Sequence, residues 1–550
     1  MSLLELTIGD YLKQTATRWP NLVAVIQASS GERMTWAALD AVTDRYARGF
    51  LKLGLTKGDR ILLWMGNRIE WCISFLAAAK IGAITCAANV QLETEEIRHL
   101  LKFSGARAII FGDGFRDRCY ADILEGIYKD APLGRPKPIM IHAGEHHEKL
   151  GMEFTALGEL AKNDNEPLPG DVTVHDVANI VFTSGTTRCP KGVMLTHRNL
   201  VNNSFFTGER MRITDKDRLC LVVPFAHCFG LTTGILLGIG SGTALILVEA
   251  FRPDDVLCAI ETYACTVLHG VPAMFQRIIE RQTEANYQVS SLRTGIVAGA
   301  VCPEKVMRGI VATLGMTEAA VAYGQTETSP GCTQTFPEDS LEVKLHTVGK
   351  PLPSVEMRVI NPSTGAACAP GEWGELCTRG YHVMKGYYAD EKMTASVIDS
   401  NGWFHSRDLG YVDENGNYHF ENRLKELIIR GGENISPAEI EGAILDHEKI
   451  RDVKVYGIPS EAYGEEVAAS ICLNPGCQMT TEELQQYLHG RIAWYKIPKY
   501  MDFCEHFELA ASGKVSARLL RERMLRKLAQ TRKGAGSSKA AASLLTTSKS

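Results

Sequence analysis

The stretch at residues 183–192 reads TSGTTRCPKG. Its small hydroxyl side chains donate hydrogen bonds, its glycines let backbone N–H groups approach closely, and Lys191 meets negative charge. It follows the apolar segment 178–182, so the loop should leave the end of a buried strand, where α/β sheets bind ligands. We therefore expect a cradle for a polyphosphate such as ATP. Solvated turns use the same residues, so an ordinary surface loop is the alternative.

The spacing of this loop does not fit the P-loop NTPase pattern. That pattern places a Ser or Thr directly after its lysine to reach the metal, whereas Lys191 is followed by Gly192. A different nucleotide chemistry is therefore implied.

The totals describe a protein of two or more domains. The chain has 550 residues, 45% hydrophobic and 22% charged, which is more than one core normally organises. Its formal net charge of -5 argues against a nucleic-acid partner, so any polyanion must be held by local groups. The 15 cysteines form no CxxC pair and no His/Cys metal spacing, which argues against a zinc site and a disulfide scaffold. A reducing, cytoplasmic setting is expected.

Neither a secretory signal nor a transmembrane segment is expected. Residues 1–5 do not begin a basic and apolar leader. The uncharged stretch 229–248 is about long enough to cross a bilayer, but Gly238, Gly240 and Gly242 interrupt it like a turn. We favour a buried helix, turn and strand. Peripheral contact with a membrane stays open.

Alternation of helix-like stretches with short apolar strands predicts an α/β fold. Examples are a helix at 73–80 and strands at 106–111 and 266–271. Such alternation is typical of stacked, mainly parallel sheets with helices. We expect these elements to form a large N-terminal domain over residues 1–424.

The amino-acid composition of the chain changes near residue 348. Residues 348–422 are rich in Gly, Pro and short strand candidates, which indicates a β-rich subdomain. Short helices and strands return after it, so residues 425–528 are predicted to form a small α+β domain on a hinge. Residues 529–550 have little to bury and are predicted to be disordered.

Two further segments carry groups suited to a nucleotide. Residues 323–328 read YGQTET, where an aromatic ring beside a glycine can stack on adenine, and a hydroxyl and a carboxylate can hold a phosphate-bound magnesium ion. Residues 402–408 read GWFHSRD, and the carboxylate of Asp408 can accept both ribose hydroxyls. Cations follow at residues 423, 425 and 514. Each signal alone has low specificity.

In this order and spacing the motifs closely resemble the adenylate-forming superfamily, which includes acyl-CoA synthetases, nonribosomal peptide adenylation domains and firefly-type luciferases. The resemblance covers residues 4–528. It implies a large N-terminal domain and a small C-terminal domain that rotates between two half-reactions. A carboxylate first attacks the α-phosphate of Mg-ATP to give an acyl-adenylate and pyrophosphate. A thiol, usually of coenzyme A, then displaces AMP.

The resemblance implies a role for each position that matches the motifs. The phosphate loop would comprise Thr183, Ser184, Gly185, Thr186, Thr187 and Lys191. Adenine would be flanked by Gly299, Ala300, Tyr323 and Gly324, with Thr326 in the same nucleotide site. Asp408 and Arg423 would bind the ribose, and Lys425 would be the hinge residue. The residues nearest the magnesium ion would be Thr183 and Glu327.

Two catalytic positions are also implied. Lys514 resembles the lysine that bridges carboxylate and phosphate oxygens, and a mobile ammonium suits an in-line displacement at phosphorus. His227, in the sequence PFAHCFG at 224–230, resembles a histidine between the acyl pocket and the thiol tunnel. Ala226 stands where the family often has a bulky residue, which favours a roomier pocket. The alternatives are a solvated surface lysine and a buried structural histidine.

The chain departs from the family pattern inside two motifs. Arg188 and Arg407 stand where the family almost always has glycine. Where such a position has φ > 0, arginine would cost on the order of 1 kcal/mol or more, although a guanidinium could also add phosphate contacts. Asn422, Glu508 and Ala510 are further departures. Together they weaken the expectation of efficient turnover and leave the fold unchanged.

The leading hypothesis is a ligase that joins a fatty or other apolar carboxylic acid to coenzyme A. The sequences GGENI at 431–435 and PAEIE at 437–441 resemble the acyl-CoA synthetase form of the hinge region. Small-molecule acid, ATP, Mg²⁺ and coenzyme A are the expected ligands, and the chain is expected to be a monomer or homodimer. The alternatives are a binding protein with little turnover, because of Arg188 and Arg407, and an enzyme that adenylates an aryl or amino acid.

Overall fold

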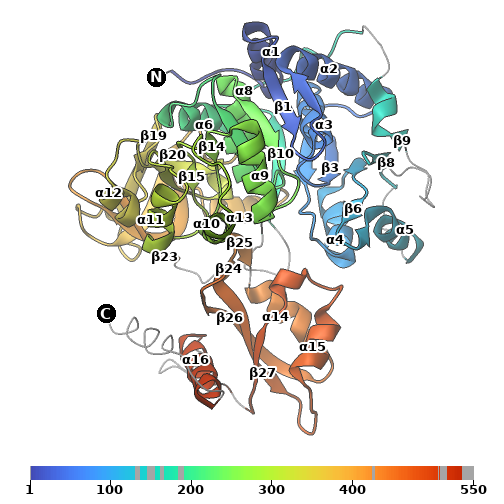
Figure 1. Cartoon of the computed structure of the whole chain (residues 1–550). Helices are drawn as coiled ribbons and strands as arrows, with labels where there is room; N and C mark the ends of the chain where they lie inside the picture. The colour runs from blue at the N-terminus through green and yellow to red at the C-terminus, as the bar shows by residue number, and fades with distance from the viewer. Residues whose placement is uncertain are drawn as a thin grey trace. The chain divides into compact units, whose positions relative to one another are not determined.

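The computed structural model describes residues 2–130, 137–144, 155–161, 166–183, 191–423, 428–435, 437–505, 507 and 517–534. These residues form two compact units, the first ending at Arg423 and the second beginning at Ile428. Figure 1 labels the helices and strands of both units along the chain. Each unit has a core of its own and is described by itself.

The first unit is built on an eight-stranded sheet. Its strands, in spatial order, are β21 (Gly386–Tyr387), β11 (Lys191–Thr196), β10 (Val177–Thr183), β4 (Ile84–Ala87), β3 (Arg60–Trp64), β5 (Ala108–Phe111), β8 (Ile139–His142) and β9 (Thr155–Ala156). The strands from β10 to β9 are parallel, and β11 pairs antiparallel with both β10 and β21. The strands β3 and β5 are almost continuously apolar because both faces of a parallel sheet are covered.

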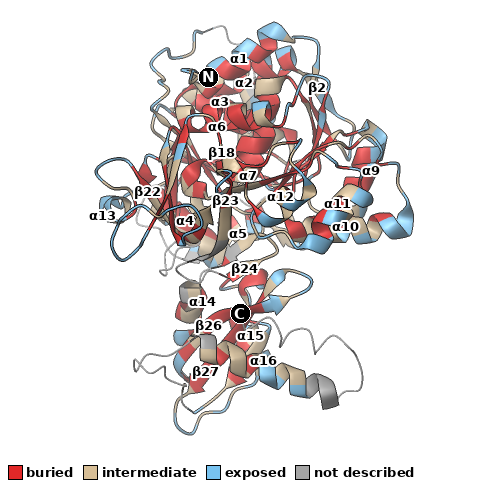
Figure 2. Ribbon diagram, turned by 90° about the vertical axis from the view of Figure 1, so that its left-hand side faces the viewer, coloured by how far each residue is buried: buried red, intermediate tan, exposed pale blue. Residues whose placement is uncertain are grey.

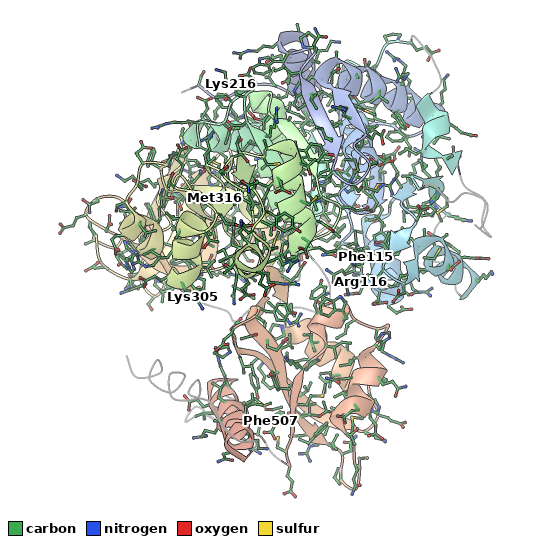
Figure 3. The ribbon with its side chains drawn as sticks, in the orientation of Figure 1. Phe115, Arg116, Lys216, Lys305, Met316 and Phe507 are labelled. Carbon is green, nitrogen blue, oxygen red and sulfur yellow. The ribbon has the colours of Figure 1, made fainter. Side chains whose placement is uncertain are left out.

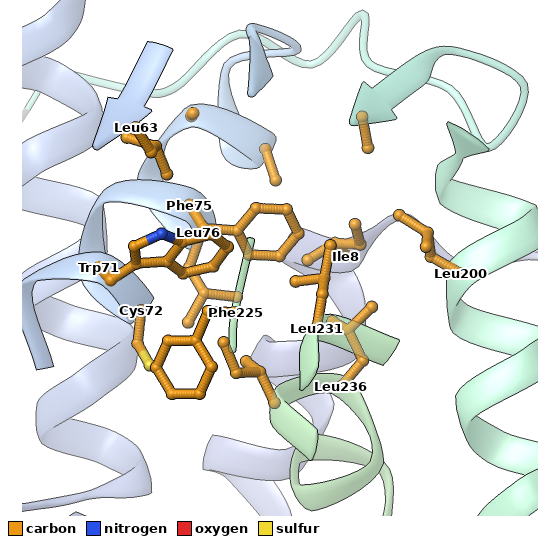
Figure 4. Packing of buried hydrophobic residues seen from close by; sticks show 14 of the residues in the cluster. Ile8, Leu63, Trp71, Cys72, Phe75, Leu76, Leu200, Phe225, Leu231 and Leu236 are labelled. Carbon is orange, nitrogen blue, oxygen red and sulfur yellow. The ribbon is translucent and has the colours of Figure 1, made fainter. Parts of the chain in front are cut away.

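A second sheet of five strands shares its interior with the first. Its order is β14 (Val267–Leu268), β12 (Arg218–Leu221), β13 (Ala244–Leu247), β1 (Val23–Gln27) and β2 (Arg33–Thr35). One hydrophobic cluster joins both sheets to α1 (Ile8–Arg18), α2 (Trp36–Lys52), α3 (Ile69–Lys80) and α6 (His197–Arg210). Within it the ring centroids of Trp71 and Phe225 lie 5.3 Å apart (Figure 4). The helix α3 is buried on nearly every side, which explains why its sequence is apolar all round (Figure 2).

A third sheet continues the first unit. Its strands are β15 (Ile296–Val297), β16 (Ala320–Gly324), β17 (Gly331–Gln334) and β18 (Lys350–Pro351), of which β15 and β16 are parallel. The helices α9 (Pro253–Tyr263), α10 (Pro272–Ala285) and α11 (Glu304–Ala312) pack with it in a second hydrophobic cluster. Met316, which Figure 3 labels, lies fully buried in this cluster.

The predicted β-rich region contains an antiparallel sheet. Its strands are β19 (Val355–Ile360), β20 (Gly374–Gly380), β22 (Phe404–Val412) and β23 (Tyr418–Arg423). The other elements of the first unit are α4 (Thr94–Ser104), β6 (Gly114–Phe115), β7 (Arg118–Cys119), α5 (Tyr120–Asp130), η2 (Leu157–Ala161), α7 (Cys228–Gly230), the π-helix η3 (Leu231–Leu236), α8 (Leu237–Ser241), η4 (Thr326–Thr328), α12 (Leu341–His346) and α13 (Glu391–Ala395).

The second unit is an α+β domain. Its sheet contains β25 (Glu433–Ile435), β24 (Ile428–Arg430), β27 (Gly464–Leu473), β26 (Ile450–Ser460) and β28 (Tyr500–Phe503). Its helices are α14 (Pro437–Leu445), α15 (Thr481–Leu488), η5 (Trp494–Lys496) and α16 (Ala517–Gly534). The predicted α/β class with a large first domain and a smaller second domain is therefore confirmed. The boundary near residue 424 and the mobility of the hinge stay predictions, because residues 424–427 lie outside the described residues.

The uncharged stretch 229–248 folds as a helix, a turn and a strand, as predicted. The helical segment ends at Ser241, Gly242 turns with φ of 72°, and β13 follows. Across the part of the chain that the structure describes, every helix is too short or too polar to cross a bilayer.

One predicted boundary is corrected. The tail expected to be disordered from residue 529 begins with helix, since α16 continues to Gly534. Leu525 and Leu528 of α16 pack against the cluster around Ile458, which gives the helix an apolar face to bury.

Candidate active site

The ends of the predicted phosphate loop are held by a β-hairpin. In the pairing of β10 with β11, Thr183 lies opposite Lys191. Residues 184–190, with Ser184, Gly185, Thr186, Thr187 and Arg188, lie outside the described residues. The hairpin belongs to the eight-stranded sheet, so the sheet positions both Thr183 and Lys191.

Lys191 and Glu327 both contact one tyrosine, which the sequence did not indicate as a site residue. Nζ of Lys191 lies 5.0 Å from the centroid of the Tyr387 ring. The hydroxyl of Tyr387 donates a hydrogen bond of 2.8 Å to Oε1 of Glu327. Burial and the negative charge of Glu327 raise the pKa of Tyr387 far above its usual range, so this hydroxyl keeps its proton and donates. Pairing of β21 with β11 explains the contact, since it sets Tyr387 opposite Val193.

Thr183 and Glu327, the two predicted magnesium residues, lie on neighbouring elements. Glu327 belongs to η4, which packs against β11, and β11 pairs with the strand that ends at Thr183. A carboxylate and a hydroxyl are oxygen ligands of the kind that Mg²⁺ prefers. The residues present therefore fit a magnesium ion.

The predicted adenine residues follow two adjacent parallel strands. Gly299 and Ala300 follow β15 after one intervening residue, and Tyr323 and Gly324 end β16. Carboxyl ends of parallel strands meet at one edge of a sheet, where α/β folds bind ligands. Gly299 has φ of 85°, and a Cβ on Gly324 would lie 1.8 Å from the carbonyl oxygen of Pro330. Glycine is therefore required at both positions.

Asp408, the predicted ribose ligand, is held by two donors. Its side chain is buried, and Oδ2 accepts hydrogen bonds from the Tyr323 hydroxyl (2.8 Å) and from Nε2 of Gln325 (2.5 Å). Burial, followed by the charge of Asp408, raises the pKa of Tyr323 well above its usual value. Gln325 is a residue that sequence reasoning missed, although it lies within the YGQTET motif. The motifs at 323–328 and 402–408 thus form one hydrogen-bonded group.

Arg407 adopts the left-handed conformation that its place in the motif suggested. Its φ is 59°, and its backbone N–H donates to Oε1 of Glu375 (2.9 Å). The positive charge of Arg407 also lowers the pKa of Tyr387, against the larger opposite effects of burial and Glu327. The positive φ supports the expectation that arginine strains the backbone here. The effect of its charge on Tyr387 supports the expectation that the guanidinium acts on the phosphate side of the site.

The His227 segment lies beside the same helical turn as Glu327. His227 stands at the N-cap position before α7, without a side-chain capping hydrogen bond, and Sγ of Cys228 contacts the Thr326 hydroxyl at 3.6 Å. The apolar segment that follows His227 is packed into the protein and lines no open pocket at Leu231 and Leu236. These two side chains are at most 1% exposed and belong to the main core (Figure 4).

Arg423 is the second of the two residues predicted to bind the ribose. It lies on β23 directly opposite Asp408 in the antiparallel pairing with β22. Lys425 and Lys514 lie outside the described residues. Their roles stay predictions.

Two family models match the chain, one in each of its two units. The family model for the AMP-binding enzyme matches residues 12–388, and that for the AMP-binding enzyme C-terminal domain matches residues 439–514. The chain therefore belongs to the AMP-binding enzyme family, and it is an AMP-forming acyl-CoA ligase. The adenylate-forming resemblance is confirmed.

Individual relatives cover nearly the whole chain. The putative acyl-CoA synthetase YngI of Bacillus subtilis (strain 168) is 39% identical over 537 residues, 95% of this chain and 98% of that protein. The mitochondrial medium-chain acyl-CoA ligase ACSF2 of Homo sapiens is 35% identical over 541 residues, 95% of this chain and 88% of that protein.

Solved structures show the same fold. The o-succinylbenzoate CoA synthetase MenE of Bacillus subtilis is 28% identical with a TM-score of 0.79, over 94% of this chain and 99% of that chain. The fatty acyl CoA synthetase of Mycobacterium tuberculosis is 30% identical with a TM-score of 0.69, over 94% of this chain and 98% of that chain. The amide bond synthetase McbA of Marinactinospora thermotolerans, 23% identical with a TM-score of 0.82 over 94% and 99% of the two chains, shares the fold.

Proposed function

We propose that this protein joins a medium- or long-chain fatty acid, or another apolar carboxylic acid, to coenzyme A. The acid would be activated as an acyl-adenylate with release of pyrophosphate, and the thiol would then displace AMP. The observation that carries the proposal is the Lys191–Tyr387–Glu327 arrangement, because one tyrosine contacts both a cation and a carboxylate next to the strands from which the phosphate loop begins and ends.

At the phosphate end, the ammonium of Lys191 would donate to phosphate oxygens of ATP. Glu327 and Thr183 would hold Mg²⁺, which neutralises charge on the phosphates when it is bound. Tyr387 keeps the Glu327 carboxylate oriented through its donated hydrogen bond. These residues would bind and position the triphosphate before the acid attacks.

At the nucleoside end, Asp408 would accept from the ribose hydroxyls, with Arg423 beside it. Tyr323 and Gln325 both donate to Oδ2 of Asp408, which supports a carboxylate oriented for this purpose. His227 would border the acyl pocket, and Lys514 would bridge the carboxylate and the α-phosphate as charge builds in the first transition state.

Fatty acids are favoured as substrates by the names of two relatives, a medium-chain acyl-CoA ligase and a fatty acyl CoA synthetase. An amino-acid substrate would need an acidic partner for its ammonium, and the PFAHCFG segment at 224–230 has none. The cysteines of the described residues are free, which supports a reducing, cytoplasmic setting. A monomer or homodimer is proposed.

A panel assay tests the substrate class. Purified protein is given ATP, Mg²⁺ and coenzyme A with acids from acetate to palmitate and with benzoate, and AMP and pyrophosphate are measured. We expect the highest kcat/KM with a fatty acid of medium or long chain. A preference for benzoate would favour the aryl alternative. Absence of acid-dependent pyrophosphate release with every acid would favour the binding protein implied by the arginines at 188 and 407.

The role of Lys514 is tested by Lys514→Ala. Acyl-adenylate formation should fall at least about 100-fold, because the cation that stabilises the transition state is lost, while ATP still binds. Lys454→Ala, which removes a lysine paired with Glu441 in the same unit, is the matched control. Pyrophosphate release at the wild-type rate in Lys514→Ala would refute the assignment.

A further inference from the structure

A group of potential metal ligands lies on the antiparallel sheet, and one of its residues, His405, belongs to the GWFHSRD motif. Glu375 and Cys377 belong to β20, and His405 belongs to β22, directly opposite Cys377 in the pairing. One ligand atom from each residue lies within 4.8 Å of the others. In the part of the chain that the structure describes, this is the one group of three such side chains with ligand atoms so close.

Two distances within the group are close to those around a tetrahedral zinc ion. Sγ of Cys377 lies 3.6 Å from Nδ1 of His405, and Oε2 of Glu375 lies 3.1 Å from the same nitrogen. Zn–S and Zn–N bonds at a tetrahedral angle separate sulfur and nitrogen by about 3.6 Å, and Zn–N and Zn–O bonds separate nitrogen and oxygen by about 3.4 Å. These two separations are therefore close to those around one ion, and the remaining pair of ligand atoms, from Cys377 and Glu375, lies within 4.8 Å.

The surroundings allow an ion to enter and to be held. The Cys377 thiol is fully buried, whereas the His405 side chain is 28% exposed and offers a path from solvent. Oδ2 of Asp399 lies 3.9 Å from Nε2 of His405, near enough to orient the ring as an outer-shell carboxylate. Arg358 opposes a cation nearby, but its Nη2 lies 3.6 Å from the same Asp399 oxygen, which balances its charge.

Charge balance also suits a divalent ion. A thiolate and a carboxylate with a neutral imidazole give two negative charges, which a divalent cation neutralises. A thiol binds a metal as its thiolate, so the Cys377 thiol would release its proton when the ion binds.

We propose that Glu375, Cys377 and His405 form a binding site for a divalent transition-metal ion of the zinc type, with water in the fourth position. The sulfur and imidazole ligands distinguish this site from the all-oxygen environment that Mg²⁺ prefers. The ion would use Oε2 of Glu375 and leave Oε1 free to accept from Arg407 N–H, next to the ribose carboxylate. The site is thus separate from the nucleotide site but joined to it by one side chain.

Cobalt absorption tests the proposal without reference to catalysis. The full-length protein, reduced and treated with a chelator that is then removed, is titrated with Co²⁺. We expect one equivalent to produce a thiolate-to-cobalt charge-transfer band in the near ultraviolet, and Zn²⁺ to abolish it by displacement. Zn²⁺ should also raise the thermal unfolding midpoint, because a ligand that binds the folded state stabilises it.

Substitutions show whether these residues hold the ion. Cys377→Ser should remove the band and weaken Zn²⁺ binding by at least about 100-fold, since loss of an outer-shell partner alone costs 10–100-fold. Cys368→Ser, a cysteine of the same subdomain outside the group, should leave both unchanged. His405→Gln, at a partly exposed position, provides a second test if Cys377→Ser does not fold. The proposal would be overturned if the folded wild-type protein bound neither Co²⁺ nor Zn²⁺. It would also be overturned if Cys377→Ser and His405→Gln both bound these ions as tightly as the wild-type protein does.

Discussion

Tyr387 contacts both the cation Lys191 and the carboxylate Glu327 at the phosphate end of the site. It stacks under Lys191 and donates to Glu327, and burial keeps its hydroxyl protonated. A hydrogen bond to a charged group contributes about 1.5–3 kcal/mol. The orientation of Glu327 therefore depends on one hydroxyl group.

Tyr387→Phe should lower kcat/KM for ATP roughly 10-fold or more, because the ring remains and only the donated hydrogen bond is lost. The measurement is acid-dependent pyrophosphate release at varied ATP. Tyr388→Phe is the matched control, since that hydroxyl donates to the backbone of Ser104 at 3.4 Å. Equal activity in the two variants would mean that Glu327 does not need Tyr387.

Arg407 carries a backbone effect and a charge effect that two substitutions can separate. Arg407→Ala removes the charge and keeps a side chain at φ of 59°, whereas Arg407→Gly removes both the charge and the strain. The glycine variant should be more stable than the alanine variant by about 1 kcal/mol, measured from urea unfolding midpoints. Both should raise KM for ATP if the guanidinium contacts phosphate. Coincident unfolding curves for the two variants would count against backbone strain.

At the scale of elements, α16 is anchored to the sheet of the second unit by one buried carboxylate. Asp502 on β28 is 4% exposed and pairs with Arg523 (3.0 Å) and with Lys527. The apolar face of α16 contributes Leu520 and Met524 to a small cluster. In the chain, α16 begins three residues after Lys514.

Asp502→Asn should loosen α16, because both cations lose their buried counter-charge. We expect the free energy of opening α16 to fall by about 1–2 kcal/mol, less than for a fully buried pair, because the Arg523 and Lys527 side chains are 28% and 50% exposed and water can solvate them. Amide hydrogen exchange of residues 517–530 measures this, with Asp446→Asn at the end of α14 as the control. Unchanged protection of α16 in Asp502→Asn would show that its apolar face alone holds it.

At the scale of the whole molecule, three buried histidines make the first unit sensitive to acid. Burial lowers the pKa of His197 to about 4 and the pKa values of His269 and His382 to about 3. Nδ1 of His197 accepts from Ile8 N–H, and Nδ1 of His269 accepts from Ile296 N–H, so both rings are neutral in the fold. Unfolded histidine, with a pKa near 6.5, takes up a proton first as the pH falls.

Stability of the first unit should therefore be constant above about pH 6.5 and decline as the pH falls towards 4. Each of the three histidines contributes about 2 kcal/mol of the loss at pH 5, because the unfolded state binds more protons than the folded state. Thermal unfolding midpoints between pH 4 and 8 check this. His269→Gln should flatten the decline, since the amide oxygen can still accept and does not titrate, and exposed His346→Gln should not. A flat profile in the wild-type protein would contradict the argument.

Much of the fold and of the site was predictable from short stretches of sequence. Continuous apolar runs identified strands such as β10, and small residues after them identified the position of the phosphate loop. The YGQTET motif and Asp408 were recognised separately, and the structure shows that Tyr323 and Gln325 join them. Local periodicity reports which residues are buried and where a strand ends, but it contains no information on which strands become neighbours.

Tertiary structure alone selected the partners that lie far apart in the chain. Tyr387 reaches Glu327 across 60 positions, because β21 pairs with β11 and η4 packs against β11. Cys377 meets His405 across 28 positions, because antiparallel pairing sets them opposite one another. The absence of a cysteine spacing motif predicted no zinc site, yet two adjacent strands bring three ligand types together. By itself, the sequence determined the class of fold, the nucleotide chemistry and the position of each motif, since these depend on local residue types. Strand pairing decided how the motifs combine, because hydrogen bonding between distant strands sets which side chains share one surface.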